Sequence, residues 1–190
     1  MTKTGKLLFL SQFVLAAAIV VCTIILPQFL FSRDQGGISN YGVHRETIWP
    51  FTIGFIGCGL LVCAAALSLP VATAHRAGLR TTLLLVGGLT LLVAFSTYTY
   101  KVNRFFDLVH VYSAVLLFVA EVPLALWFAL RLTKTTTARW LLGLFITGFI
   151  LSGLTYFGLI HVLFMAETMT TFSFGVLMIL AVESVSIPTN

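Results

Sequence analysis

The apolar part of the chain begins with residues 7–26, which read LLFLSQFVLAAAIVVCTIIL. A helix needs about 20 mostly apolar residues to cross the hydrocarbon core of a bilayer, so this stretch has the length of one span. Lys3 and Lys6 precede it, but it is longer than the apolar region of a secretory signal peptide and carries no small-residue cleavage site. We therefore expect a first transmembrane helix that is retained.

The composition extends this interpretation to the whole chain. Hydrophobic residues make up 59% of the 190 residues and charged residues only 9%, whereas a soluble domain has about 25% charged residues. Apolar segments of spanning length lie at about 7–29, 50–72, 81–98, 106–130, 140–163 and 169–187. The sequence therefore predicts an all-α, polytopic integral membrane protein with six transmembrane helices in one bundle and a single domain.

The basic residues predict the orientation of this bundle, because short cytoplasmic connections retain Lys and Arg. Placing the N-terminus inside puts seven basic residues on the cytoplasmic side: Lys3, Lys6, Arg76, Arg80, Arg131, Lys134 and Arg139. The opposite side then has four: Arg33, Arg45, Lys101 and Arg104. We therefore expect both termini in the cytoplasm and residues 30–49 in an outer loop.

Charge and cysteines exclude two other classes of protein. The net charge is +5, but the basic residues lie singly between apolar runs, so no nucleic-acid surface is indicated. Cys22, Cys58 and Cys63 lie inside apolar segments without zinc-knuckle spacing, which argues against a disulfide framework. Glycines of the second segment, Gly54, Gly57 and Gly59, are placed to let this helix approach a neighbour closely.

Several polar side chains map to the outer side of this topology. His44, His110 and His161 could together hold Zn²⁺, which lowers the pKa of a bound water to about 7 and makes it a nucleophile. Asp107 lies three residues before His110 and can orient its imidazole. Asp107 and Glu167, which lies just past the fifth segment, are the candidate orienter or acid/base of such a site. A haem held between His110 and His161 is a further alternative. The alternative without a functional site is a solvated rim of polar residues.

Glu121 lies midway along the fourth segment, where an ionised carboxylate costs a few kcal/mol on insertion scales. Pro123 follows and removes a helical hydrogen bond, so a kink is expected there. This pair suits a proton relay or a ligand cavity. The structural alternative is a hydrogen bond from Glu121 to a neighbouring hydroxyl, such as that of Thr90, Thr147 or Ser152. Glu183 is expected to have a structural role, by reaching the interface or by pairing with Arg76, Arg80 or Arg139.

The outer loop carries the run Gly37-Ile38-Ser39-Asn40-Tyr41-Gly42, followed by Glu46 and by Trp49-Pro50-Phe51-Thr52-Ile53-Gly54. This pattern resembles the DRAM/Sfk-like superfamily of six-helix membrane proteins and its uncharacterised bacterial relatives. Asn40 stands where that family has an acid, and His44-Arg45-Glu46 replaces a Pro-Pro-Glu-like stretch. The resemblance implies a lipid-related role and loop-organising positions at Ser39, Asn40, Gly42 and Glu46, but it implies no catalytic residue.

The sequence thus predicts a membrane protein that binds or organises lipid, or a partner protein, through an outward-facing polar mouth. The alternatives are a metal-dependent hydrolase of a lipid-like substrate, with His44, His110 and His161 as ligands, and a proton-coupled transporter using Glu121. Enzymatic activity stays open. We expect no cofactor, with zinc as the alternative, and membrane lipids, a partner membrane protein or a second copy as partners. The expected location is a bacterial plasma membrane.

Overall fold

The computed structural model describes residues 1–30, 37–71, 73, 75–97 and 104–186, except the side chains of residues 29, 30, 97, 107 and 186. The described part is helical, and its long helices are α1 (Lys3–Ile25), α2 (Ile48–Leu67), α3 (Arg76–Thr97), α4 (Arg104–Trp127), α5 (Thr136–Tyr156) and α6 (Leu163–Ser186). Two short 3₁₀ helices, η1 (Pro27–Leu30) and η2 (Ile38–Val43), join α1 to α2, and a π-helix, η3 (Phe128–Thr133), continues α4.

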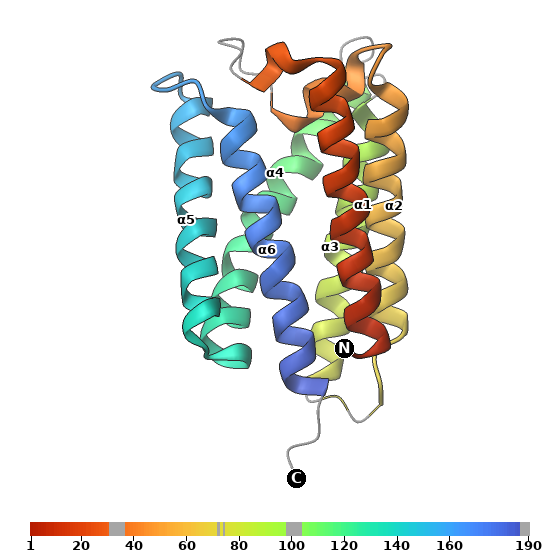
Figure 1. The fold of residues 1–190 in the computed structure, drawn as a ribbon, viewed down its shortest axis with the longest axis vertical. Coiled ribbons are helices and arrows are strands. Elements are labelled where there is room, and N and C mark those ends of the chain that lie inside the picture. Colours follow the sequence, from red (N-terminus) through yellow and green to blue (C-terminus); the bar gives the residue numbers. More distant parts are fainter. Residues whose placement is uncertain (31–36, 72, 74, 98–103, 187–190) are drawn as a thin grey trace.

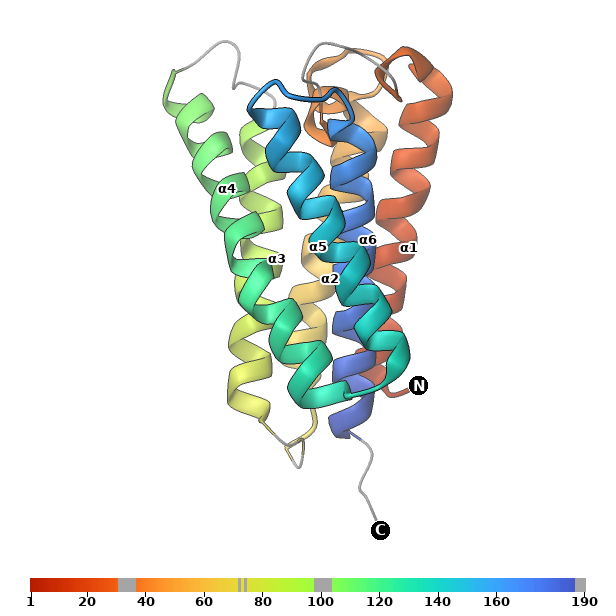
Figure 2. The ribbon, with the colours of Figure 1, turned by 90° about the vertical axis from the view of Figure 1, so that its left-hand side faces the viewer.

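In Figure 1, α5, α6 and α1 lie in front of α4 and α3, and α2 lies at the side of α1. Figure 2 shows α4 and α3 on one side of the bundle and α6 and α1 on the other. Successive helices run in opposite directions, so α1 begins and α6 ends at the same end of the bundle, which we call the terminal end (Figure 1). The opposite end carries η1, η2 and the α5–α6 turn, and we call it the loop end. Helix α1 closes the bundle by packing against both α2 and α6.

All six predicted helices are present, and the largest differences from the predicted boundaries are at the end of α5 and the start of α6. Helix α5 ends at Tyr156 instead of residue 163, and α6 begins at Leu163 instead of residue 169. Gly158 adopts φ +73°, a left-handed conformation that glycine takes without strain and that ends a helix. Residues between Tyr156 and Leu163 therefore form the turn. They are apolar, so the sequence prediction included them in the fifth helix.

Local chemistry sets the helix ends at the terminal end. The hydroxyl of Thr2 accepts a hydrogen bond from Gly5 N at 3.0 Å and caps α1, and the hydroxyl of Thr135 caps α5 through Ala138 N at 3.2 Å. Between α4 and α5, Lys134 adopts a left-handed conformation with φ 55°, and its N–H donates to Ala129 O, as in a wide helical turn.

Glycines allow close helix packing, as predicted for α2. A side chain at Gly54 would collide with Ala18 of α1, so Gly54 faces that helix. A Cβ atom on Gly59 would lie 3.0 Å from the carbonyl oxygen of Gly87 in α3, and one on Gly87 would lie 2.9 Å from the carbonyl oxygen of Gly59. The backbones of α2 and α3 therefore meet at this pair of glycines, and any side chain there would separate them.

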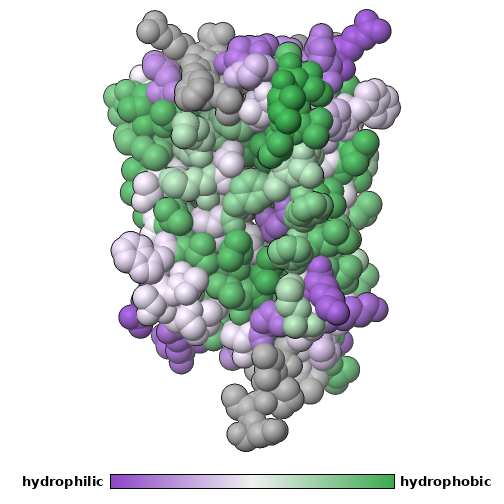
Figure 3. Space-filling view, viewed as in Figure 1, coloured by the Kyte–Doolittle hydropathy of each residue, from purple (hydrophilic) through white to green (hydrophobic). Residues whose placement is uncertain are grey.

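The face of the bundle drawn in Figure 3 is mostly apolar along its length and polar at its ends. Each of the six helices is long and apolar enough to cross a membrane. Large apolar side chains are exposed on them, for example Phe13, Ile53, Phe95 and Val119. Trp49 and Trp140 are also exposed, near the first residues of α2 and α5. This distribution fits a multi-pass membrane protein, whose apolar belt contacts lipid tails and whose aromatic residues lie near the interfaces.

Candidate functional site

Glu167 anchors the 3₁₀ helix η2 to α6 at the loop end. Its carboxylate accepts a hydrogen bond from Ile38 N at 2.7 Å, which satisfies an N–H group at the start of η2. A side chain at Gly37 would occupy the position of this carboxylate. Glu167 lies inside α6 and is partly buried. Its geometry is therefore that of a cap for a neighbouring segment.

Tyr41 is the buried centre of the same segment. It is fully buried, and its ring packs edge-on against Phe164 of α6 with centroids 5.7 Å apart. Its hydroxyl lies 3.4 Å from the carbonyl oxygen of Leu26, as donor, and Thr47 Oγ1 donates to the Tyr41 carbonyl at 2.7 Å. Burial raises the pKa of the Tyr41 phenol, while the hydrogen bond to Thr23 lowers it. These contacts hold residues 37–47 onto the ends of α1 and α6.

Replacing Gly37 with alanine is expected to loosen this segment. The added methyl group must displace the Glu167 carboxylate from Ile38 N, and overpacking of this kind costs about 1–3 kcal/mol. Limited proteolysis of the purified protein should cut the segment between α1 and α2 faster, and the melting temperature should fall. Gly143→Ala is the control, because nothing lies within 4 Å of a Cβ atom at Gly143. Equal proteolysis of the two variants would contradict the role assigned to Glu167.

The four loop-motif residues have different positions in this segment. Gly42 is buried within η2, while Ser39 and Asn40 are partly exposed on it. The backbone N–H of Asn40 donates to the Gly37 carbonyl at 3.0 Å, which forms the first turn of η2. Glu46 is exposed between η2 and α2. The motif therefore lies in the compact turn that leads into α2, while its anchor, Glu167, comes from far along the chain.

The structure does not bring the three candidate histidines together. His44 ends η2 and is partly exposed, and His161 is exposed in the α5–α6 turn. His110 is buried against α3, with Nδ1 at 3.3 Å from the Val93 carbonyl oxygen and 3.4 Å from Ser96 Oγ. The side chain of Asp107 lies outside the described residues. Within the described part of the chain, no three His, Cys, Asp or Glu side chains are grouped so that they could hold a metal ion.

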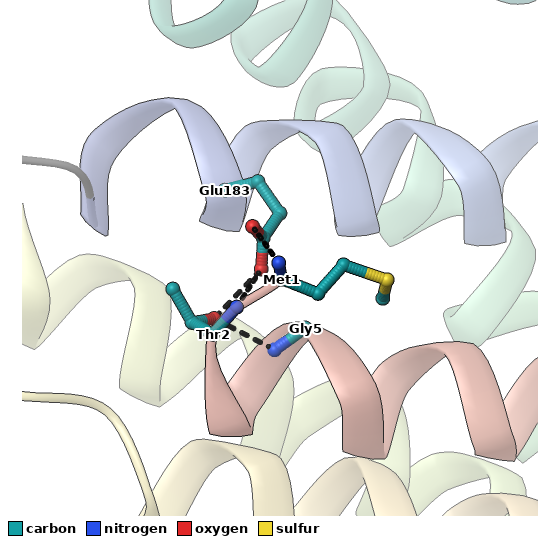
Figure 4. Close-up of polar contacts among 4 residues, drawn as sticks. All are labelled: Met1, Thr2, Gly5 and Glu183. Carbon is teal, nitrogen blue, oxygen red and sulfur yellow. Dashed lines mark hydrogen bonds and ion pairs between the residues drawn. The ribbon is translucent and has the colours of Figure 1, made fainter.

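Glu183 binds the first two residues of the chain. The sequence predicted that it pairs with an arginine or reaches the interface. Its carboxylate accepts hydrogen bonds from Thr2 N at 2.8 Å and Thr2 Oγ1 at 2.7 Å, and lies 3.9 Å from the amino group of Met1 (Figure 4). Gly5 leaves the space that this carboxylate occupies. Glu183 therefore fastens the end of α6 to the start of α1, which agrees with the structural role expected for it.

Glu121 lies inside the bundle and lines a cavity between the helices. Only 7% of its surface is exposed, and the cavity has a volume of about 70 Å³. Five helices line it, α1, α2, α3, α4 and α6, through Gln12, Leu15, Phe55, Cys58, Val62, Val86, Thr90, Leu117, Glu121, Thr171, Phe174, Gly175 and Met178. The lining is mostly apolar with a few polar groups, which is the usual composition of a small-ligand site.

None of the three hydroxyl groups expected as partners is hydrogen-bonded to Glu121. Thr90 lines the same cavity but donates its hydroxyl hydrogen to the Val86 carbonyl at 2.8 Å. Thr147 is exposed on α5 and donates to the Gly143 carbonyl, and the buried Ser152 hydroxyl has no hydrogen-bond partner in the described residues. Within the described part of the structure, Glu121 is therefore a buried carboxyl group without a hydrogen bond.

Gln12 is the cavity residue that sequence reasoning missed. It is partly exposed on α1, and its Oε1 atom is buried without a hydrogen-bond partner in the described residues. The side chain lies against Gly175 of α6, in the space that a larger residue there would fill. Figure 3 shows hydrophilic surface between α1 and α6 in the middle of an otherwise apolar face. A glutamine inside an apolar segment was the available signal.

Helix α4 changes character close to Glu121. Pro123 lies two residues further on and has no N–H, so the carbonyl of Val119 loses its helical donor. Beyond it, Ala125, Phe128 and Ala129 are fully buried, and the Phe128 ring lies 5.8 Å from that of Phe174. The rest of α4 packs along α3 and makes few contacts with α5 or α6. Glu121 therefore lies at the boundary between a tightly packed part of α4 and a loosely packed part.

Comparison of the chain with family models, with curated proteins and with solved structures gives no match in any of the three. The resemblance of the loop segment to the DRAM/Sfk-like superfamily therefore stays a prediction. Evidence for the function of this chain therefore comes from its own geometry.

Proposed function

We propose that this chain is a multi-pass membrane protein that binds and releases a proton at Glu121, as the coupling site of a transporter. The observation that carries the proposal is the Glu121 carboxyl group, 93% buried beside a cavity, without a hydrogen bond from any described residue. Ionisable residues inside membrane-spanning helices commonly belong to ion or proton pathways. This function is one of the alternatives predicted from the sequence, and the cavity favours it.

The membrane topology is part of the proposal. Of the seven basic residues assigned to the cytoplasmic side, Lys3 and Lys6 begin α1, Arg76 and Arg80 begin α3, and the others flank the α4–α5 turn. These positions all belong to the terminal end, which we therefore place in the cytoplasm. Glu121 then lies near the middle of the bilayer, in a bacterial plasma membrane or a membrane of similar thickness.

A polar mouth at the loop end receives less support from the geometry. Glu167 caps η2, and His110 is bonded to α3, so two of the groups expected to form the mouth hold the fold together. His44 and His161 do not join them in a metal-binding group among the described residues. Binding of lipid or of a partner protein at this end stays a prediction, as does the zinc hydrolase.

Infrared difference spectroscopy on protein reconstituted in liposomes tests the coupling site. Changing from alkaline to acidic buffer should increase the carbonyl-stretch band of a protonated carboxyl group. Glu121→Gln should remove that band, and Glu121→Asp should shift it. Glu46→Gln is the matched control, because it neutralises an exposed carboxylate outside the helices. The proposal fails if Glu121→Gln leaves the spectra unchanged.

A further inference from the structure

We propose that the cavity at Glu121 is a site for a small monovalent cation, an alkali metal ion or ammonium, which competes with the proton. The inference deepens the proposed function and rests on it. The cation is the second species that binds at this site, and Gln12 is a further ligand. Proton and cation would then occupy Glu121 alternately, as an exchanging transporter requires.

The chemistry of the lining selects a cation. Gln12 Oε1 is a buried acceptor that lacks a donor among the described residues. The Glu121 carboxyl group lines the same cavity and accepts no hydrogen bond from the described residues. Thr90 Oγ1 has already donated its hydrogen to Val86, so only its lone pairs face other groups. These oxygens come from three helices, α1, α3 and α4, that line one space. Hard cations and N–H donors are the ligands that such a set of oxygen acceptors prefers.

The charge of the site indicates a single positive charge. Among the described residues that line the cavity, Glu121 is the one acid, and no lysine, arginine or histidine is present. Divalent cations in proteins usually take several carboxylates. One carboxylate neutralises one monovalent cation, and the buried pair then carries no net charge, which reduces the penalty of burying either ion.

The size of the cavity agrees with this ligand class. Its volume is about 70 Å³, and one water needs about 10–15 Å³ of such space. An alkali ion or ammonium with part of its hydration shell therefore fits. The aromatic rings of Phe55 and Phe174 also line the cavity, and ring faces attract cations.

The groups around Glu121 leave it as the titrating partner of the cation. From α2, the buried Cys58 thiol lines the same cavity. The residues facing the cavity from α1, α3 and α6 carry amide, hydroxyl or apolar side chains without a charge. Cation and proton therefore meet at one carboxyl group, and a rise in the concentration of either should displace the other.

The experiment follows the infrared band of Glu121 in liposomes at a fixed pH where the band is present. NaCl, KCl or NH₄Cl replaces choline chloride at constant ionic strength, and the effective cation should reduce the band. Once the cation exceeds its dissociation constant, each tenfold increase should shift the titration midpoint by about one pH unit, as linkage requires. Comparing the three salts distinguishes an alkali ion from ammonium.

Gln12→Leu tests the second ligand. It should weaken the cation effect about tenfold, as loss of one polar ligand does, while the band still titrates with buffer pH. Gln28→Leu is the matched control, because Gln28 is exposed outside the long helices. Melting temperatures of both variants, measured in the same detergent, show whether each is folded, and Glu121→Asp provides a variant that keeps the charge.

The outcomes separate the inference from the proposed function. If Glu121 titrates but all three salts act like choline chloride, the cation site is overturned and the proton site stands. If Gln12→Leu responds to the cation like the wild type, Gln12 is not a ligand and the inference as stated is overturned. A Glu121 band that never responds to pH overturns both proposals.

Discussion

Gly87→Ala is expected to lower the free energy of unfolding by about 1–3 kcal/mol, the usual cost of overpacking a tight interface. The Cβ atom would lie 2.6 Å from Cys63 Sγ and 2.9 Å from the carbonyl oxygen of Gly59. The thiol can rotate away, but the carbonyl belongs to the backbone of α2. The helices must therefore separate at the centre of their interface.

Gly88 supplies the matched control for this prediction. It is the next residue of α3, and a Cβ atom there has nothing within 4 Å. Because alanine favours a helix over glycine by about 1 kcal/mol, Gly88→Ala should be neutral or stabilising. Unfolding of the two purified variants in mixed micelles, with increasing SDS, measures the difference. Equal stability of the two variants would show that α2 and α3 are not in contact at this glycine.

The helices could be predicted from the sequence because their signal is local. Each needs about 20 apolar residues, and this property does not depend on the rest of the chain. The α5–α6 boundary could not be placed as well. Residues 157–163 are apolar enough to continue a helix, and the turn depends on the backbone conformation of Gly158. Hydropathy carries no information on that conformation.

The side-chain partners could be predicted only in part. Glu121 was identified because a carboxyl group midway along an apolar segment is unusual whatever surrounds it. Gln12 has the same property more weakly, and its relation to Glu121 depends on how α1, α4 and α6 are placed around the cavity. Glu167 and Glu183 bind Ile38 and Thr2, which are 129 and 181 residues away in the chain. A single sequence does not encode such distant pairs in any local pattern.

Glu121→Met is expected to stabilise the protein by about 1–3 kcal/mol while abolishing proton binding. A carboxyl group at mid-membrane depth is costly on insertion scales, whereas a flexible apolar side chain can fill the cavity. The described structure gives Glu121 no hydrogen bond that would be lost. Stabilisation at the expense of activity is the usual result when a functional polar group is removed from a core.

His110→Met provides the contrast on the same helix. His110 is as buried as Glu121, at 7% exposure for each, but its imidazole contacts the Val93 carbonyl and Ser96 Oγ. Removing a buried polar partner costs about 1–3 kcal/mol, so this variant should be destabilised. Thermal unfolding of both variants in the same detergent gives the comparison. If Glu121→Met is destabilised as strongly as His110→Met, Glu121 has a structural hydrogen-bonding role. If it is stabilised, the energetic cost of keeping a carboxyl group at this position indicates a function for it.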